Sequence, residues 1–200
     1  AAGAVERLGR RAWVAQADLE LAGEAEELWR KACAAAGPIE ILVNSASIFP
    51  RDLVTDFTEE ALDRNIKINA FAPLLLSRAL AAQGRGGRIV NLLDTRVLDY
   101  DREHAAYHLS KRMLLAITRM TALELAPEVR VNAVAPGLIL PPPGEGDEFL
   151  ERMAHTNPLR RHGGPEDVVA AVLYLVRAAF VTGQVLYVDG GRHMKGNVHG

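Results

Sequence analysis

Tyr107 and Lys111 are the side chains in this sequence whose types and spacing best fit acid–base chemistry. They stand four residues apart in a segment with helical periodicity, so both fall on one face of the predicted helix. A phenol has an ordinary pKa of about 10, and a neighbouring lysine ammonium favours the phenolate and therefore lowers that pKa. The pair is a candidate proton donor to a substrate that is being reduced. An amphipathic helix that happens to show Tyr and Lys has the same spacing.

Two kinds of segment alternate along the chain and must position this pair. Short apolar runs typical of strands occupy residues 12–16, 39–44, 88–93, 129–134 and 184–188. Longer segments with helical periodicity occupy residues 22–36, 58–82, 104–125 and 165–176. Strands that alternate with helices predict a single α/β domain with a Rossmann-type, doubly wound parallel sheet. Residues 138–165, rich in proline and glycine, predict a long substrate loop.

Polar residues or Pro-Gly follow four of the predicted strands. Ligands of such sheets bind outside the carboxyl ends of the strands. We therefore expect one crevice lined by these strand ends. Strand ends also meet turns in general, so the pattern alone leaves both interpretations open. The four places are Asp18-Leu19, Asn44–Ser47, Asp94-Thr95 and Pro136–Leu138.

Together these motifs resemble the short-chain dehydrogenase/reductase family, whose members use NAD(H) or NADP(H). The resemblance runs from about residue 12 to residue 191. It implies that the family's N-N-A-G-like motif reads NSAS at residues 44–47, and that its P-G motif is Pro136-Gly137. The positions of the family's Asn, Ser, Tyr and Lys tetrad then hold Asn69, Asp94, Tyr107 and Lys111.

The acid at position 94 departs from the family's serine and resembles the pteridine reductase branch. That branch carries Asp here and a Phe that stacks on the pterin ring, which corresponds to Phe49 in NSASIF. The segment NAFAPLLL is similar to the branch's form of the Asn helix. The resemblance implies NADPH-dependent reduction of a pteridine or dihydrofolate-like ring, with Tyr107 as proton donor, Asp94 as orienting or relaying acid, and Phe49 at the substrate. Ordinary packing of Phe49 and a turn or capping role for Asp94 are the alternatives.

The resemblance also implies a set of residues around the cofactor. Asp18 and Leu19 would contact the adenine, and the strand end at residues 44–47 would line the nicotinamide ribose. Lys111 would bond the ribose hydroxyls as well as tune Tyr107, and Asn69 would hold a proton-relay water. The full set expected at NADPH, with NADH left open, is Asp18, Leu19, Asn44, Ser45, Ala46, Ser47, Tyr107, Lys111, Pro136, Gly137 and Leu138.

One family feature is missing from the sequence. The family begins with a strand, a glycine-rich T-G-x-x-x-G-x-G turn and a helix, whose backbone approaches the pyrophosphate. Here Gly84–Gly87 precedes a strand instead of following one, and Gly144–Gly146 lacks the third glycine. Because the first strand is central in the family's sheet, we expect the 200 residues to be a fragment that lacks its N-terminal strands.

Composition excludes several other functions. Lys and Arg total 23 and Asp and Glu total 25, so a net charge of −2 gives no electrostatic case for nucleic acid or an anionic membrane. No apolar run approaches the roughly 20 residues of a membrane helix. The single cysteine, Cys33, excludes an internal disulfide and suits the cytoplasm. His104 and His108 lack a third ligand, so we expect a solvent-facing pair and no metal site.

Two other functions stay open. The first is a short-chain reductase or dehydrogenase of a ketone or alcohol, in which Asp94 is a neutral variation. The second is a non-catalytic binding subunit without the nucleotide loop. The resemblance further implies a homotetramer built partly from the helices that carry Asn69 and Tyr107, acting on a small-molecule substrate.

Overall fold

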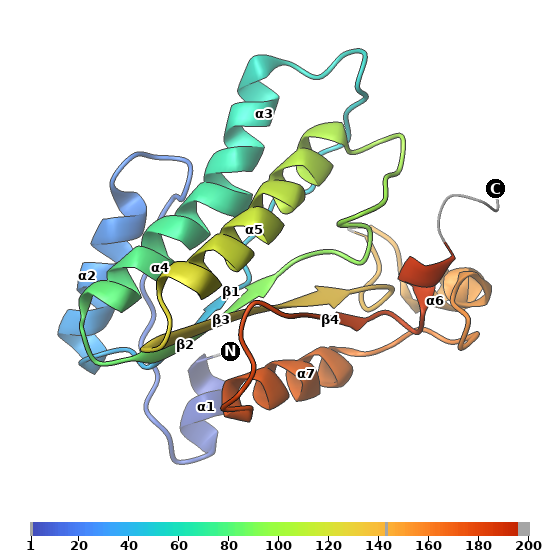
Figure 1. Ribbon diagram of the computed structural model, residues 1–200. Helices are drawn as coiled ribbons and strands as arrows, with labels where there is room; N and C mark the ends of the chain where they lie inside the picture. Colours follow the sequence, from blue (N-terminus) through green and yellow to red (C-terminus); the bar gives the residue numbers. More distant parts are fainter. Residues whose placement is uncertain (1, 143, 196–200) are drawn as a thin grey trace.

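The computed structural model describes residues 2–142 and 144–195, and it confirms the predicted α/β fold. Four parallel strands form one sheet in the order β1-β2-β3-β4, so β1 and β4 lie at its two edges. Helices connect each strand to the next (Figure 1). The strands are β1 (Ile41–Asn44), β2 (Gly87–Leu92), β3 (Val129–Pro136) and β4 (Val185–Val188).

Helices cover both faces of this sheet (Figure 1). Side chains alternate between the two faces of a strand, so Ile89 packs with α4 and α5 whereas Val90 packs with α7. Burial on two sides requires nearly continuous apolar strands, as the sequence has. The helices are α1 (Ala2–Arg7), α2 (Glu24–Ala36), α3 (Glu59–Ile66), α4 (Ala72–Ala82), α5 (Ala105–Glu124), α6 (Asp147–Met153) and α7 (Pro165–Arg177), with 3-10 turns η2 (Ala154–Thr156) and η3 (Arg192–Met194).

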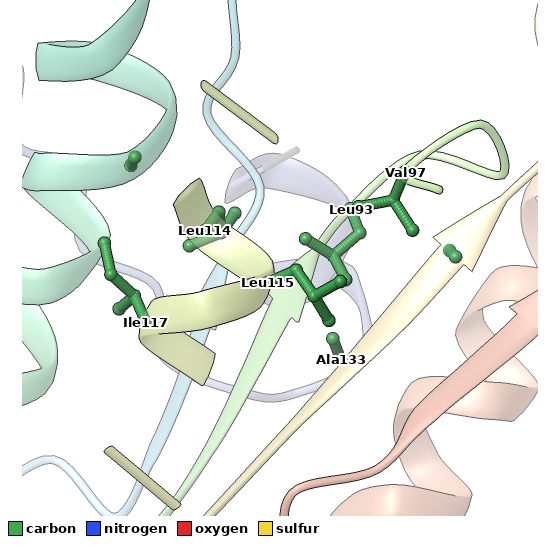
Figure 2. Close-up of a cluster of buried hydrophobic side chains, with 8 residues drawn as sticks. Leu93, Val97, Leu114, Leu115, Ile117 and Ala133 are labelled. Carbon is green, nitrogen blue, oxygen red and sulfur yellow. The ribbon is translucent and has the colours of Figure 1, made fainter. Parts of the chain in front are cut away.

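The helix α5 is held on the sheet by an apolar cluster that Figure 2 shows. Its leucines fit against β3 and against the segment that follows β2. Each fully buried leucine contributes about 1.5–3 kcal/mol to folding. This packing fixes the position of α5 over the carboxyl end of β2. The first two turns of α5, which carry Tyr107 and Lys111, therefore lie at that strand end. The labelled residues are Leu93, Val97, Leu114, Leu115, Ile117 and Ala133.

The predicted helix over residues 58–82 forms, with a local change of winding in its middle. Thr58 caps it, because its Oγ1 accepts the N–H of Ala61 over 3.1 Å. A π-helical turn, η1 (Lys67–Phe71), links α3 to α4. Pro73 has no N–H for the carbonyl four residues earlier, so the hydrogen-bond ladder shifts at this point. The shift lies at Asn69, which is one of the predicted catalytic residues.

One of the five predicted strands does not form. Residues 12–16 form no strand, and Val14 is 83% exposed. An apolar run becomes a strand only beside a partner strand, and this segment has none in the described part of the chain. The loop over residues 138–165 contains α6, because Leu150 is buried on one side of a short segment with acids in its first turn.

Candidate active site

Tyr107 and Asp94 meet at the carboxyl end of β2. Asp94 follows that strand by two residues, and Tyr107 lies in the first turn of α5. The Tyr107 hydroxyl donates to Oδ2 of Asp94 over 3.0 Å, and Tyr107 is only 6% exposed. The neighbouring Thr95 instead donates to Oδ2 of Asp189. Asp94, and not Thr95, is therefore the residue that takes the place of a tetrad serine beside the phenol.

Lys111 reaches the same strand end from the next turn of α5. Its Nζ donates to the carbonyl of Leu92 over 2.8 Å and lies 5.6 Å from the centre of the Tyr107 ring. Lys111 is 3% exposed. Burial lowers the pKa of Lys111 to about 8, although the nearby charge of Asp94 acts to raise it. The pKa of the buried ammonium thus lies close to physiological pH.

The pKa of Tyr107 moves in the opposite direction from the one that the Tyr-Lys spacing suggested. Burial raises the pKa of Tyr107 above its ordinary value, and the adjacent Asp94 carboxylate raises it further. Ionisation of Tyr107 would place a phenolate beside the Asp94 carboxylate, and the repulsion between them costs free energy, so the phenol keeps its proton. The expectation that Lys111 would lower this pKa was wrong for this structure, because the ammonium bonds the Leu92 carbonyl and not the phenol oxygen.

Asn69 fastens the strand-end loop to α5. Its side chain is fully buried, and its Oδ1 accepts the N–H of Ile48 over 2.8 Å. Its Nδ2 lies 3.0 Å from the Ile48 carbonyl and 3.0 Å from Oγ of Ser110. The Ser47 hydroxyl also donates to Asn69 Oδ1, over 3.2 Å. The amide therefore sets the position of residues 47–48 relative to the turn that follows Tyr107.

Phe49 stands beside Tyr107 and is the predicted substrate-contacting aromatic. The two rings meet edge to face with centres 4.5 Å apart. Phe49 remains 52% exposed, which leaves ring surface for a ligand. Aromatic pairs of this geometry are favourable, and an exposed ring beside a buried phenol can bind a flat aromatic molecule.

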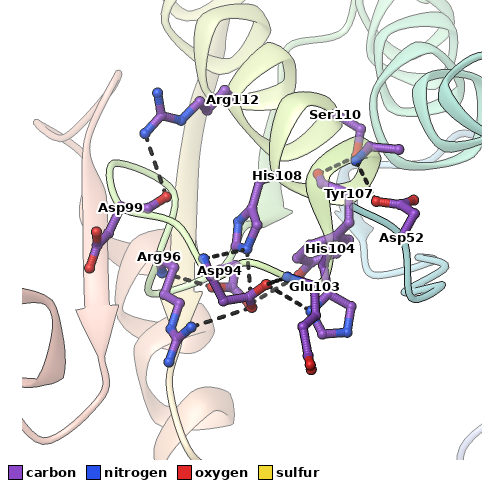
Figure 3. A network of polar contacts seen from close by, with 12 residues as sticks. Asp52, Asp94, Arg96, Asp99, Glu103, His104, Tyr107, His108, Ser110 and Arg112 are labelled. Carbon is purple, nitrogen blue, oxygen red and sulfur yellow. Dashed lines mark hydrogen bonds and ion pairs between the residues drawn. The ribbon is translucent and has the colours of Figure 1, made fainter. Parts of the chain in front are cut away.

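A polar cluster beside this site was missed from the sequence (Figure 3). Asp101 contacts Nδ1 of His104 at 2.9 Å, Nε2 of His108 at 3.2 Å and a guanidinium nitrogen of Arg96 at 3.3 Å. The expectation that both histidines face solvent was wrong, since His108 is buried and His104 is nearly so. The only sequence signal was an Asp three and seven residues before the two histidines, which becomes meaningful once α5 begins at residue 105.

The expected cofactor residues lie at the same end of the sheet, with different exposure. Ser45, Ala46 and Ser47 are exposed after β1, and residues 136–138 are half-buried after β3. Asn44 is buried, and its Nδ2 donates to Oδ1 of Asn91 over 2.8 Å. That bond joins β1 to β2, so the Asn44 side chain has a structural role in the sheet in addition to its predicted role at the cofactor.

Three of the expected cofactor positions make contacts within the protein itself. Asp18 is exposed and accepts the N–H of Glu20, whereas Leu19 packs on the cluster of α2 and α4. At Gly137 an added Cβ would lie 2.5 Å from Cβ of Asp189, so backbone packing alone requires glycine there.

A cavity of about 540 Å³ between β4 and the start of α7 includes none of the predicted catalytic residues.

Neither a metal cluster nor a membrane-spanning helix is present in residues 2–142 and 144–195. No three His, Cys, Asp or Glu side chains in these ranges are grouped to hold a metal ion. No helix in the same ranges has the length and apolar character that crossing a bilayer requires.

The fold and this site define the class of protein. A doubly wound parallel sheet that presents Tyr and Lys from one helix turn is a Rossmann-type oxidoreductase arrangement. Residues 1–193 match a family model described as enoyl-(acyl carrier protein) reductase. The chain belongs to the short-chain dehydrogenase/reductase family, and it is an NAD(P)-dependent oxidoreductase of that family.

Individual relatives differ in their stated activities. An uncharacterized oxidoreductase of Mycobacterium tuberculosis is 36% identical over 94% of this chain and 75% of that protein. D-erythrulose reductase of Gallus gallus is 33% identical over 80% of this chain and 70% of that protein. The crystal structure of FolM alternative dihydrofolate reductase 1 from Brucella canis, complexed with NADP, has a TM-score of 0.90 and 35% identity, covering 96% of this chain and 78% of that one.

Proposed function

We propose that this protein is a pteridine reductase-like enzyme that reduces a pteridine or dihydrofolate-like ring with NADPH. The contact between the Tyr107 hydroxyl and Asp94 Oδ2, with Phe49 against the same phenol, carries the proposal. A ketone reductase of this family needs only a hydroxyl at position 94, whereas a ring nitrogen that gains a proton fits an acid there. The likeness to the Brucella canis FolM structure supports the same substrate class.

The cofactor proposal rests on the strand ends around Tyr107. Ser45, Ala46 and Ser47 offer exposed backbone and hydroxyl groups, and residues 136–138 face the same end of the sheet. Lys111 has three donor protons, and the Leu92 carbonyl accepts one of them, so the ammonium has donors left for ribose hydroxyls. These groups fit a nicotinamide ribose. The choice of NADPH over NADH follows from the likeness to an NADP complex.

Asp18 and Leu19 are proposed as the adenine contacts. Asp18 is exposed, so its carboxylate is accessible to a ligand. Leu19 is half-buried against α2 and α4, so it offers an apolar edge. Asn44 is proposed to shape the ribose pocket through its bond to Asn91.

In this mechanism the protein holds and delivers a proton. A bound nicotinamide cofactor supplies the hydride. Tyr107 carries its proton at neutral pH, because the ordinary pKa of a phenol is about 10 and burial and the Asp94 carboxylate raise it further, so the phenol is the group that has a proton to donate. Asp94 accepts the phenol's hydrogen bond and orients it, and Lys111 supplies the positive charge that a phenolate would need after the transfer. Asn69 holds the loop at residues 47–48, beside which a relay water is proposed.

The proposed assembly uses the outer surfaces of η1 and α5. Exposed apolar side chains gather on α5, which bears Tyr107, and Phe71 is exposed in η1, which bears Asn69; such patches mark contacts between subunits. We propose a homotetramer of single-domain subunits that works in the cytoplasm, where the unpaired thiol of Cys33 is stable. Residues 138–165, including α6, are proposed as the substrate loop. The exposed apolar residues of α5 are Leu109, Met113, Met120 and Leu123.

Oxidation of NADPH by the full-length protein tests the function. Dihydrobiopterin, dihydrofolate and a panel of small ketones are offered as separate substrates. Turnover of the pterins that is lost in both Asp94→Ala and Tyr107→Phe is the expected result. Turnover of ketones alone would contradict the pteridine assignment, and no consumption of NADPH would contradict an enzymatic role.

A ketone or alcohol substrate is the second candidate. The similarity to D-erythrulose reductase favours it, because that relative covers most of this chain at 33% identity. The same Tyr107 and Lys111 would serve in such a reaction. The substrate panel separates the two candidates directly.

A further inference from the structure

Two loops that are distant in the sequence are fastened together beside the site. The N–H of Asp52 donates to the carbonyl of Glu103 over 2.8 Å, and Asp52 Oδ1 accepts the N–H of Ala106 over 3.1 Å. Asp52 therefore caps the start of α5 from another loop. An ion pair between Arg51 and Glu103 adds a third connection. The loop that carries Phe49 is thus anchored to the start of the helix that carries Tyr107.

His104 stacks on Phe49 at this junction. The two rings are nearly parallel, with centres 3.8 Å apart and an angle of 13° between their planes. The imidazole covers one face of the phenyl ring, and the edge contact with Tyr107 fixes the ring from a second direction. The three rings form what we call the aromatic wall, defined as Phe49, His104 and Tyr107.

Asp101 sets the orientation of the imidazole in this wall. Its Oδ1 lies 2.9 Å from Nδ1 of His104. Burial acts to raise the pKa of Asp101, but the N–H of Glu103 and the two histidines outweigh it and lower that pKa to about 2. An ionised carboxylate only accepts hydrogen bonds, so Nδ1 of His104 carries a proton and the ring cannot flip without losing this bond.

Asp101 is itself held from two further sides. Arg96 pairs with its other oxygen at 3.3 Å, and His108 lies 3.2 Å from that oxygen (Figure 3). His108 is buried and packs against the Tyr107 ring with centres 5.5 Å apart. The carboxylate that orients His104 therefore has little freedom of its own.

We propose that His104 is a positioning residue that holds the Phe49 ring ready to stack on a flat aromatic substrate, and that Asp101 acts through it. A ring that is already fixed loses less rotational freedom when a ligand binds. The stack consequently favours flat heteroaromatic or aryl substrates over small aliphatic ones. The inference rests on the proposed function in one respect, namely that Phe49 contacts the substrate.

Steady-state kinetics of four variants test the proposal. The variants are His104→Ala, His104→Phe, Asp101→Ala and the control Tyr174→Ala, whose ring is exposed on α7. Each full-length protein is assayed with dihydrobiopterin, an aryl ketone and a small aliphatic ketone. We expect His104→Ala to raise the KM of the flat substrates by about three- to tenfold with kcat within twofold, because an aromatic pair is worth that much. His104→Phe and Asp101→Ala both keep a ring at position 104 but lose the bond that orients it, so both should raise the KM of the flat substrates, by less than His104→Ala does, and Tyr174→Ala should change nothing.

The outcomes separate this inference from the proposed function. An equal KM in wild type and His104→Ala for the flat substrates overturns the inference, even if pterins are reduced. A parallel loss with the aliphatic ketone also overturns it, because a general structural role would act on all substrates. If the wild type reduces aryl ketones but no pterin, the proposed function fails, while the aryl-to-aliphatic comparison still decides the role of His104.

A second measurement needs no turnover. The 200 residues contain five phenylalanines, each of which gives a fluorine resonance after labelling with 4-fluorophenylalanine, and Phe49→Leu identifies the one from Phe49. Asp101→Ala keeps both stacked rings, yet it should shift or broaden that resonance by releasing His104. An unchanged Phe49 resonance would show that Asp101 does not orient the stack and would overturn the proposal.

Discussion

The Tyr107 hydroxyl donates a hydrogen bond to Asp94 across 3.0 Å, in a site where the phenol is almost fully buried. A carboxylate in this place differs from a serine hydroxyl in its effect on the phenol. A phenol with its ordinary pKa of about 10 is already protonated at neutral pH, and burial together with Asp94 raises the pKa of Tyr107 further. Asp94 therefore favours the protonated phenol, which is the form that can donate a proton.

Removal of the phenol oxygen should stop the reaction without harming the fold. Tyr107→Phe keeps the ring that packs against Phe49 and His108. We expect kcat to fall by about 100- to 10,000-fold, the usual contribution of a general acid. Tyr174→Phe, on the exposed side of α7, is the matched control and should retain full activity. Equal rates in Tyr107→Phe and wild type would rule out the phenol as the acid.

Replacement of Asp94 by the family's serine should change substrate preference. Asp94→Ser keeps a hydroxyl near the phenol but removes the negative charge. We expect pterin reduction to fall by at least about tenfold while reduction of a small ketone is unchanged or improved, since orientation alone suffices for a carbonyl oxygen. The ratio of kcat/KM for the two substrates measures the effect. A constant ratio would mean that Asp94 has no part in substrate choice.

Lys111 should make stability depend on pH in an unusual direction. Its pKa falls from the ordinary 10.5 to about 8 on folding, which corresponds to about 3 kcal/mol. Between those two values the unfolded chain binds more protons, so this residue makes folding more favourable as pH rises from 8 to 10.5. Below pH 8 the full cost of the buried ammonium is present in the folded protein.

The comparison with Lys111→Met isolates this contribution. At pH 7 the variant should be more stable than wild type by about 1 kcal/mol, because the removed charge outweighs the loss of the bond to the Leu92 carbonyl. The advantage should shrink and reverse as pH rises toward 10.5. Urea unfolding at several pH values measures it, and a difference independent of pH would contradict the lowered pKa.

The sequence was sufficient to predict most helices and strands, and to pair functional residues that lie on the same helix. Alternating apolar runs and amphipathic segments predicted all four strands and the long helices, because burial on two faces leaves a clear periodicity. Tyr107 and Lys111 could be paired from spacing alone, since α5 is continuous through both. Asp94 needed the resemblance to a family, as strand ends give no sign of which of two adjacent polar residues faces a helix.

The features that could not be predicted from the sequence depend on contacts between distant segments. Phe49 and His104 stack across 55 positions of sequence, and nothing in either neighbourhood signals the other. The direction of the Tyr107 pKa depends on where the Lys111 ammonium points, which spacing does not determine. Residues 12–16 had strand composition, but a strand requires a neighbour, and composition does not provide one.

Asn69 offers a test of how the loop at residues 47–48 is positioned. Asn69→Ala leaves the partly buried N–H and carbonyl of Ile48 without their partners, and each unsatisfied buried group costs about 1–3 kcal/mol. We expect the free energy of unfolding to fall by about 2–4 kcal/mol, with a higher KM for NADPH because the ribose-facing loop is released. Ser47→Ala removes only an exposed hydroxyl of the same network and should cost less than about 0.5 kcal/mol. Urea unfolding and NADPH titration measure the two effects. A variant with wild-type stability but no activity would indicate that Asn69 acts on the reaction directly and not through the loop.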